Sequence, residues 1–328
     1  MSLAFEQHGR AALHLAHAAS LAPSPHNSQP WFFVEEGHDH GFEIHADRGR
    51  RLALTDPGGR ETVIACGAAL FNVRMAVRNL GFRPAVDLLP EFGNPAYLAR
   101  VGFAAHAPAT FDEALVAGAM AHRHTHRGPF GAERVAEELL DDLRYHARAE
   151  GADLQVVDDV DQLDRIADLV RTAEEVHRAD RGHTAEIAGC VGPAGVPAEA
   201  CLYHPDCVQL AARDYLGLVR QFAVPPQKWV SRTGTVVVLT TPYDTREDWL
   251  RAGQALQRVL LYAEAHGVRA AFHTQPLEVP AVRAEVRTGV AFGRFPQLIL
   301  RLGHTNQTWA TPRRGPAETL LHSDTPVR

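Results

Sequence analysis

The feature that most constrains the fold is an internal repeat with an offset of 186 residues. Residues 55–85 and 241–271 align without a gap and share ten identical positions out of 31. Random matching at ordinary composition would give roughly two or three identities. Because the offset is far longer than the period of a solenoid, the repeat indicates a duplicated unit fused in one chain. The matched pairs include Arg60 with Arg246, Glu61 with Glu247, Gly67 with Gly253, and Gly81 with Gly267.

Both copies have the pattern of an amphipathic helix. Apolar residues recur at steps of three and four, which puts them on one helical face. Each pattern ends at a glycine, Gly81 or Gly267, which suits the left-handed position after a helix C-terminus. The apolar face contains Val63, Cys66, Leu70, Val73, Val77 and Leu80 in the first copy, and Ala252, Leu256, Val259 and Ala263 in the second.

The rest of the chain predicts an α+β fold. At 328 residues the chain is long for one simple core, so we expect a first half at 1–115 and a second half at 116–328. Besides the repeat, we expect helices at 4–20, 134–149 and 161–178, and strands near 31–35, 42–46, 84–89, 97–103, 154–157, 235–240 and 298–302.

Residues 180–230 are rich in glycine, alanine and proline and only weakly periodic. A segment of this length without clear structure is usually functional or mobile. It predicts either a lid over a site or a surface insertion, and the pattern favours neither. Tyr203, Phe222 and Trp229 are candidate lid aromatics, although core packing is the more common use of such side chains.

Composition excludes several classes of protein. The net charge of −6 gives no general attraction to nucleic acid or anionic membranes. No apolar run approaches the roughly 20 residues of a membrane span. The first 20 residues mix acids, bases and histidines and lack the pattern of a signal peptide. We therefore expect a cytoplasmic protein without nucleic-acid or membrane partners.

The cysteines provide only a weak metal signal. Cys201, His204 and Cys207 are spaced as C-x-x-H-x-x-C, which supplies three candidate ligands without a fourth at finger-like spacing. We expect no metal site. Cys66 lies in the apolar helical pattern and is expected in the core.

Cationic residues gather in two places. The stretch HRHTHRGPF, residues 122–130, places Arg123, Thr125 and Arg127 together without an acidic neighbour. Two guanidiniums and a hydroxyl suit a phosphate, although a solvated basic turn is the safer interpretation of this stretch alone. Arg313 and Arg314 lie in a proline-stiffened turn that could face a phosphate or form a basic tail.

Well-known catalytic and nucleotide motifs are absent. There is no Walker A motif, and the glycines at 189, 192 and 195 have the wrong spacing for a dinucleotide fold and follow no strand. A serine nucleophile elbow and an HExxH motif are also missing. The stretch APSPHNSQPWFF, residues 22–33, predicts either an ordinary helix-to-strand connection or a stiff rim, because prolines fix φ and remove backbone donors.

Taken together, six segments resemble the FMN-binding nitroreductase superfamily, and within it the Acg-like actinobacterial branch, in which two nitroreductase-type halves are fused. The resemblance covers nearly the whole chain. The segments are Ala22–Trp31 (APSPHNSQPW), Thr55–Leu70 (TDPGGRETVIACGAAL), Arg123–Phe130 (RHTHRGPF), Thr274–Glu278 (TQPLE), Pro296–Gly303 (PQLILRLG) and Thr311–Arg314 (TPRR).

The resemblance implies a nitroreductase-like pseudo-dimer with one complete FMN site and one lost site. The first half would supply a rim under the flavin, and the second half would supply the phosphate cage and a segment along the pyrimidine and N5 edge of the ring. If His124 and His126 titrate near neutrality, the charge of the cage depends on pH. The implied rim is Pro23, Ser24, Pro25 and Asn27; the cage is Arg123, His124, Thr125 and Arg127 with Arg313 and Arg314; the edge segment is Gln275, Pro276, Leu277 and Glu278.

The function implied by this resemblance is FMN-dependent oxidoreduction. Hydride would pass from NAD(P)H through flavin N5 to an electron-poor small molecule such as a nitroaromatic, quinone or enone, without a catalytic side chain. The alternative is a non-catalytic protein that sequesters FMN under a closed lid. A structural protein that has lost the flavin is disfavoured by the intact set of candidate residues. We expect a monomer, as a pseudo-dimer, or a weak homodimer.

Overall fold

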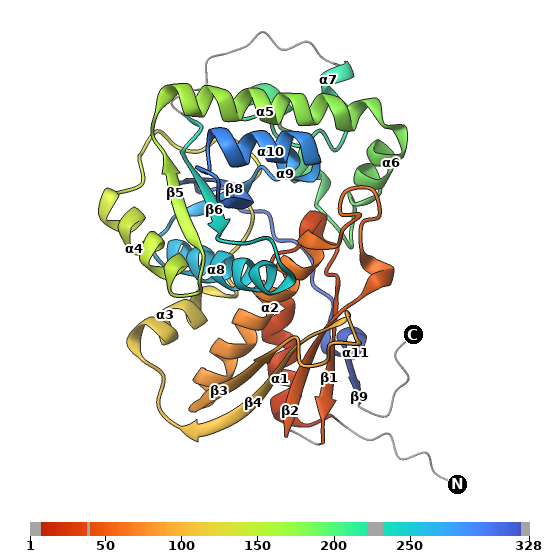
Figure 1. Ribbon diagram of the computed structural model, residues 1–328, viewed down its shortest axis with the longest axis vertical. Coiled ribbons are helices and arrows are strands. Elements are labelled where there is room, and N and C mark those ends of the chain that lie inside the picture. The colour runs from red at the N-terminus through yellow and green to blue at the C-terminus, as the bar shows by residue number, and fades with distance from the viewer. Residues whose placement is uncertain (1–7, 38–39, 222–231, 323–328) are drawn as a thin grey trace.

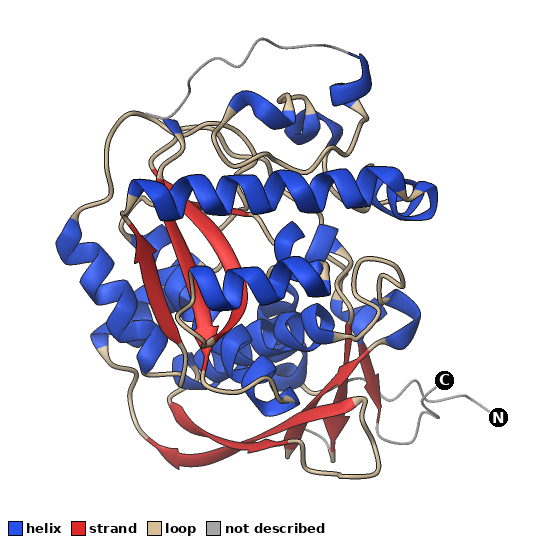
Figure 2. Ribbon diagram, turned by 45° about the horizontal axis from the view of Figure 1, so that its top comes forward, coloured by secondary structure: helices blue, strands red, loops and turns tan. Residues whose placement is uncertain are grey.

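The computed structural model describes residues 8–37, 40–221 and 232–322, and these form four layers (Figures 1 and 2). A five-stranded sheet of order β3-β4-β2-β1-β9 forms one outer layer, and a four-stranded sheet of order β5-β6-β8-β7 forms the third layer. Helices α1 (Arg10–Ser20), α2 (Arg60–Asn79) and α8 (Arg246–Ala265) lie between the two sheets. Helices α5 (Val160–Ala179) and α10 (Pro280–Gly289) cover the outer face of the four-stranded sheet.

The five-stranded sheet collects the strands of the first half and one strand from the C-terminal end. β1 (Trp31–Glu36), β2 (Gly41–Ala46), β3 (Phe82–Leu88) and β4 (Tyr97–His106) pair antiparallel. β9 (Leu320–His322) joins the edge parallel to β1. The C-terminal segment therefore returns to the sheet of the first half. Side chains at alternate positions, among them Trp31, Phe33, Phe42 and Ile44, are buried against α1 and α2.

The four-stranded sheet is buried on both faces. β5 (Asp153–Val157), β6 (Thr235–Thr241), β7 (Arg269–Phe272) and β8 (Phe295–Gly303) pair antiparallel. Because side chains alternate along a strand, Val237 and Leu239 of β6 pack toward α8, whereas Val236 and Val238 pack toward α5 and α10. This double burial explains the unbroken apolar run TVVVLT in the sequence.

The two repeated helices cross at their matched glycines. A Cβ on Gly253 would lie 2.0 Å from the carbonyl oxygen of Ile64, and a Cβ on Gly67 would lie 2.3 Å from the carbonyl oxygen of Leu250. Only glycine permits this approach. Contact between equivalent residues is the geometry of an isologous interface.

The matched arginines make reciprocal contacts across the same crossing. Arg60 at the start of α2 donates to the backbone carbonyl of Gln297 in β8, with Nη1 and O 2.8 Å apart. Arg246 at the start of α8 donates to the backbone carbonyl of Pro95, just before β4. Each repeated helix is therefore tied at its start to the sheet of the other half.

The α+β prediction is confirmed, with differences in several elements. Helix α1 begins at Arg10 in the described residues, whereas the helix was expected from residue 4, and residues 4–7 lie outside the described residues. The backbone N–H of Gly9 donates to the Glu35 carboxylate at 3.0 Å, so a donor at the helix start that has no partner within the helix is satisfied. α4 (Glu137–Arg148) begins three residues later than expected. The short elements α3 (Phe111–Ala119), β7, α10, α11 (Pro316–Thr319) and β9 were not expected. Gly81 and Gly267 have φ of 87° and 74°, as predicted for glycines after a helix end.

The segment expected to lack clear structure contains several short elements. α6 (Arg181–Gly189) follows α5 after a break at Asp180, which has an extended backbone, and its first turn is capped by Asp180, whose carboxylate accepts from the N–H of Gly182 at 2.8 Å. Turns at Ala198–Cys201 and Pro205–Cys207 and the short helix α7 (Leu218–Gln221) follow. Phe222 and Trp229 lie outside the described residues. Among the described helices, none combines the length and the apolar character needed to cross a membrane.

Candidate functional site

A cavity lies between segments from residues 23–65 and segments from residues 125–301, and it contains about 1020 Å³ of empty space including the part open to solvent. Its wall is built from the rim at 23–26, the start of α2, the basic motif at 125–127, parts of 200–215, residues 271–275 and the strand β8. Segments far apart in the sequence therefore share one cavity.

The rim has a strained backbone. Pro23, Ser24 and Pro25 line the cavity, and the turn Pro25–Asn27 follows them. His26, Asn27 and Gln29 have φ of 49°, 61° and 48°. Non-glycine residues adopt this left-handed conformation uncommonly, although asparagine and histidine do so more often than most, and strained backbone of this kind is enriched at functional sites. The hydroxyl of Ser24 accepts from the N–H of Gln29 at 2.9 Å, which holds the turn closed.

Asn27 ties the rim to two other segments and does not line the cavity. Its side-chain amide donates to the carbonyl of Pro312 at 3.0 Å and to the carbonyl of Ala194 at 3.3 Å. Its Oδ1 accepts from Arg313 Nη1 at 2.8 Å. Asn27 is 6 % exposed. Its role in this structure is therefore to position Arg313 and the surrounding loops.

The basic motif presents two of its predicted residues directly to the cavity. Thr125 and Arg127 form part of the wall, and Thr125 makes a parallel β-bridge with Ala270 at the start of β7. The buried Arg301 of β8 donates to the carbonyl of Gly128 at 3.2 Å and so supports the turn from behind. The fold thus fixes the motif against the four-stranded sheet.

Arg123 and Arg313 add buried positive charge next to Arg127. Burial, followed by the neighbouring Arg313, lowers the pKa of Arg123 to about 9. Burial and Arg127 lower the pKa of Arg313 to about 10. The charged form of Arg123 is disfavoured by Arg313 and Arg127, and that of Arg313 by Arg127, so an anion bound among them would relieve the repulsion.

Several buried polar atoms around the cavity have no hydrogen-bond partner in the part of the chain that the structure describes. They are Arg123 Nε, Arg313 Nε, His124 Nδ1 and Gln275 Oε1. Unsatisfied buried polar atoms are rare in folded proteins. Gln275 lies on the cavity wall, and Arg123 and Arg313 are electrostatic neighbours of Arg127, which also lines it, so these atoms are available to a ligand in or beside the cavity.

His124 and His126 do not make the charge of the motif sensitive to pH near neutrality. Burial is the main cause that lowers the pKa of each to about 4, and nearby arginines add to it. Both imidazoles are therefore neutral at physiological pH. The cage depends for its charge on guanidiniums alone.

The segment Gln275–Glu278 forms the short helix α9 and contributes unequally to the cavity. Gln275 lines the wall and is 1 % exposed, with Nε2 donating to the carbonyl of Ala211 at 3.3 Å. Pro276 and Leu277 are buried away from the wall. Glu278 also lies outside the wall and forms an ion pair with Arg213 at 2.5 Å.

Arg314 serves the C-terminal segment rather than the cavity. Its guanidinium donates to the carbonyls of Gln29 at 3.2 Å and Trp31 at 3.1 Å, and also to the carbonyl of Glu318. These bonds hold the chain that leads to β9 against the start of β1. Of the two arginines in the predicted turn, only Arg313 lies close to Arg123 and Arg127.

Residues 190–216, which we call the covering segment, contribute part of the cavity wall. Its wall residues include Tyr203, Arg213 and Tyr215. The Tyr215 hydroxyl lies 2.8 Å from Nδ1 of His26 on the rim. A Cβ on Gly128 would lie 2.7 Å from the ring of Tyr203, so the segment packs closely on the basic motif. The lid interpretation of this segment stays a prediction.

Three residues of the cavity wall were not predicted from the sequence: Arg213, Glu61 and Arg301. Arg213 lies in the weakly periodic segment, where no pattern marked it. Arg301 lies in an apolar strand and is 1 % exposed. Glu61 carried a signal that could have been used: it is identical to Glu247 in the repeat and comes at the first turn of its helix.

Within the described residues, one group of potential metal ligands comes close together. His177, His183 and Glu278 have ligand atoms within 4.8 Å of one another. Arg213 donates to His177 Nδ1 at 3.1 Å and also pairs with Glu278. Its positive charge opposes a cation at this place, so the group is an ion-pair network. The structure does not bring Cys201, His204 and Cys207 together as a ligand set.

The fold and the cavity define an α+β protein with a cation-rich site for a small anionic ligand. No family model matches the chain. Two Mycobacterium tuberculosis proteins, both provisionally named NAD(P)H nitroreductase, are similar over most of their length. One of them, Acg, is 30% identical over 318 residues, which covers 93% of each chain. The other is 31% identical over 304 residues, 90% of this chain and 87% of its own.

The chain belongs to the family of these proteins, the Acg-like nitroreductases. Among solved structures, the FMN-dependent nitroreductase NfnB from Mycobacterium smegmatis in complex with NADPH is similar with 19% identity and a TM-score of 0.41, covering 63% of this chain and 97% of its own. A Desulfitobacterium hafniense nitroreductase with bound FMN gives 14% identity and a TM-score of 0.40, covering 65% and 98%.

Proposed function

We propose that the protein is an FMN-dependent oxidoreductase of the nitroreductase type. It would take hydride from NAD(P)H and reduce an electron-poor small molecule of the nitroaromatic, quinone or enone class. The observation that carries the proposal is the cavity, which joins the rim of one half to the basic motif of the other. Relatives named as NAD(P)H nitroreductases support the same reaction class.

The residues around the cavity fit FMN. Arg127 and Thr125, with Arg123 and Arg313 beside them, would bind the phosphate through charge-assisted hydrogen bonds. The partnerless Nε atoms of Arg123 and Arg313 are donors that such a ligand would satisfy. Pro23, Ser24 and Pro25 would form the stiff rim, and the free Oε1 of Gln275 would accept from a ligand N–H. When bound, FMN supplies the redox chemistry that side chains lack.

We further propose that the chain is a fused pseudo-dimer that carries one such site. The matched glycines at the crossing of α2 and α8 and the reciprocal contacts of Arg60 and Arg246 support this view. The rim comes from the predicted half 1–115, and the basic motif comes from 116–328. The half boundary and the cytoplasmic location stay predictions.

A second candidate function is FMN sequestration without turnover. It is favoured by one observation, the covering segment, which is tied down through Tyr215 on the rim and through the buried pair of Arg213 and Glu278. A covered site would hold FMN while hindering access by a nicotinamide.

The two functions are separated by a visible spectrum under anaerobic conditions. The purified protein, loaded with FMN, is mixed with NADPH or NADH and then with menadione. Bleaching of the flavin band by a nicotinamide and its recovery with menadione are the results expected of an oxidoreductase. Bleaching by dithionite alone would favour sequestration. A protein that does not retain FMN would contradict both.

A further inference from the structure

We propose that Glu61 is the acid that gives a proton to the acceptor as it is reduced in the cavity. This inference rests on the proposed function. Reduction of a quinone by hydride adds two electrons and one proton, so a second proton must arrive for the hydroquinone to form. A carboxylic acid on the cavity wall can supply it.

The position of Glu61 is fixed by its neighbours at the start of α2. Its backbone N–H donates to Asp56 Oδ1 at 3.1 Å, and the N–H of Thr62 donates to Asp56 Oδ2 at 2.8 Å. Its Oε1 accepts from Arg60 Nη2 at 3.1 Å. Arg60 is held in turn by the carbonyl of Gln297. The carboxyl group is therefore pre-positioned before a substrate arrives.

One carboxyl oxygen of Glu61 is left for a ligand. The side chain is 8 % exposed and lines the cavity. Oε1 is occupied by Arg60, whereas Oε2 has no hydrogen-bond partner in the described part of the chain. A proton on Glu61 therefore belongs on Oε2, where it can be donated to a molecule in the cavity.

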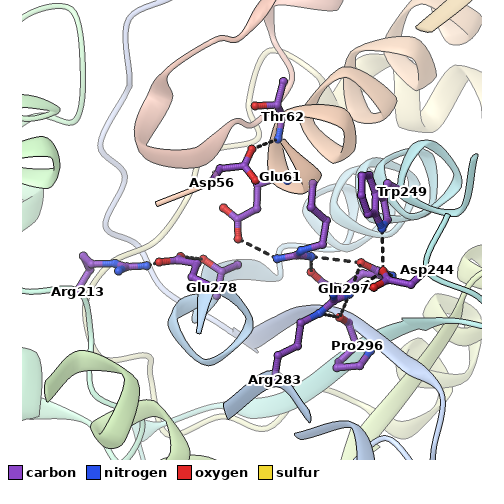
Figure 3. A network of polar contacts seen from close by, with 12 residues as sticks. Asp56, Glu61, Thr62, Arg213, Asp244, Trp249, Glu278, Arg283, Pro296 and Gln297 are labelled. Carbon is purple, nitrogen blue, oxygen red and sulfur yellow. Dashed lines mark hydrogen bonds and ion pairs between the residues drawn. The ribbon is translucent and has the colours of Figure 1, made fainter. Parts of the chain in front are cut away.

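The charges that face Glu61 come from three segments and nearly offset one another. Arg60 and Asp56 belong to its own helix start, Glu278 comes from α9, and Arg213 comes from the covering segment. Figure 3 shows Glu61, Glu278 and Arg213 extending toward the same region. With two guanidiniums set against two carboxylates, burial becomes decisive, and burial together with Glu278 raises the pKa of Glu61 above its ordinary value.

Four other titratable groups on the wall are poor proton donors near neutrality. Burial lowers the pKa of His26 to about 3 and that of His126 to about 4, so neither holds the extra proton. Burial raises the pKa of Cys201 to about 11 and also raises that of Tyr215, so both retain their protons too tightly. Among these four groups and Glu61, only Glu61 both holds a proton near neutral pH and can donate it there.

The step balances with a quinone as the acceptor. Hydride, with its two electrons, forms a new bond to the quinone. The O–H bond of Glu61 breaks, its electron pair stays on the carboxylate, and the proton forms an O–H bond on the quinone oxygen. Water entering through the open side of the cavity returns a proton to Oε2, and the hydride comes from NAD(P)H as the proposed function requires.

The test compares Glu61→Gln with Glu247→Gln, its matched position in the repeat. Glu247 is 46 % exposed and pairs with Arg251 on the surface. FMN-loaded protein is reduced with dithionite and mixed with menadione over a range of pH. We expect Glu61→Gln to slow flavin reoxidation about 100-fold. The wild-type rate should fall as pH rises through the pKa of Glu61, and the profile of the variant should be flat.

A second readout does not depend on activity. The infrared spectrum of the FMN-free protein should contain a protonated carboxyl band near neutral pH that Glu61→Gln removes and Glu247→Gln retains. Glu61→Asp, which keeps the acid, should restore part of the rate, and it replaces the glutamine variant if that variant fails to fold. Equal rates and equal bands in Glu61→Gln and Glu247→Gln would overturn the assignment. Failure of the proposed function would appear differently, as wild-type protein that does not retain FMN.

Discussion

Glu278 is a buried carboxylate that forms an ion pair with Arg213 of the covering segment. Burial alone would raise its pKa, but Arg213, followed by His177 and His26, outweighs burial and lowers the pKa below the ordinary value. The carboxylate is therefore ionised in the folded protein, and it anchors Arg213 from the segment above. Because its pKa is depressed, the stability it contributes is fully present above the ordinary pKa of a glutamate. That contribution is lost as pH falls through the lowered pKa.

Glu278→Gln should loosen the covering segment by about 3 kcal/mol, because it leaves the Arg213 guanidinium buried with an incomplete partner. Hydrogen exchange within residues 190–216 measures this loss directly. The protection factors of the wild-type segment, corrected for the pH dependence of intrinsic amide exchange, should fall as pH drops below the ordinary pKa of a glutamate, and the variant should lose most of that acid dependence. Unchanged protection in the variant would show that the ion pair does not hold the segment.

At the scale of elements, the crossing of α2 and α8 depends on glycine. Gly253→Ala would place a Cβ 2.0 Å from a backbone oxygen and 2.8 Å from the backbone nitrogen of Ala68. Because backbone atoms cannot move aside cheaply, the helices must separate. We expect a loss of about 3 kcal/mol or more in the free energy of unfolding, measured by urea denaturation.

Gly118→Ala is the matched control for this substitution. Gly118 lies in helix α3 and has open space where a Cβ would be built. Alanine there should be neutral or stabilising by up to about 1 kcal/mol. If both variants unfold at the same urea concentration, the close approach of the two helices is not what holds the layers together.

Sequence patterns predicted most of the elements because burial sets their periodicity. For this reason the sequence predicted the apolar faces of the two repeated helices. It also predicted the strand β6, whose side chains are buried on both faces of the sheet. The start of α1 was wrong because Glu35, distant in sequence, satisfies the helix end. β7 was missed because four residues carry too little pattern.

The candidate site was only partly readable. The rim and the basic motif were found from short motifs, and the structure brings Pro23, Ser24, Thr125 and Arg127 to one cavity. Glu278 and Arg314 lie elsewhere because each is bound by a partner, Arg213 or a row of backbone carbonyls, that no local pattern could indicate. Arg213 itself depends on how an irregular segment lies over the cavity, and periodicity does not encode that.

At the scale of the whole molecule, segments from distant parts of the chain build one cavity. The rim, the basic motif and the helix crossing all come from one chain, so a second copy is not needed to complete the cavity. We therefore expect a monomer in light-scattering measurements at low micromolar concentration. A dimer that persists on dilution would indicate that the pseudo-dimer account is incomplete.

The most direct measurement compares the affinity of the protein for FMN with its affinity for riboflavin, which lacks the phosphate. Both affinities are determined from the quenching of flavin fluorescence on binding. The wild type should prefer FMN strongly. Arg123→Ala with Arg127→Ala removes two phosphate partners, so it should weaken FMN binding by about 100-fold or more and leave riboflavin binding nearly unchanged. Arg48→Ala with Arg51→Ala, which removes the same charge from exposed positions, should change neither affinity. An undiminished preference for FMN in the Arg123 and Arg127 variant would contradict the account.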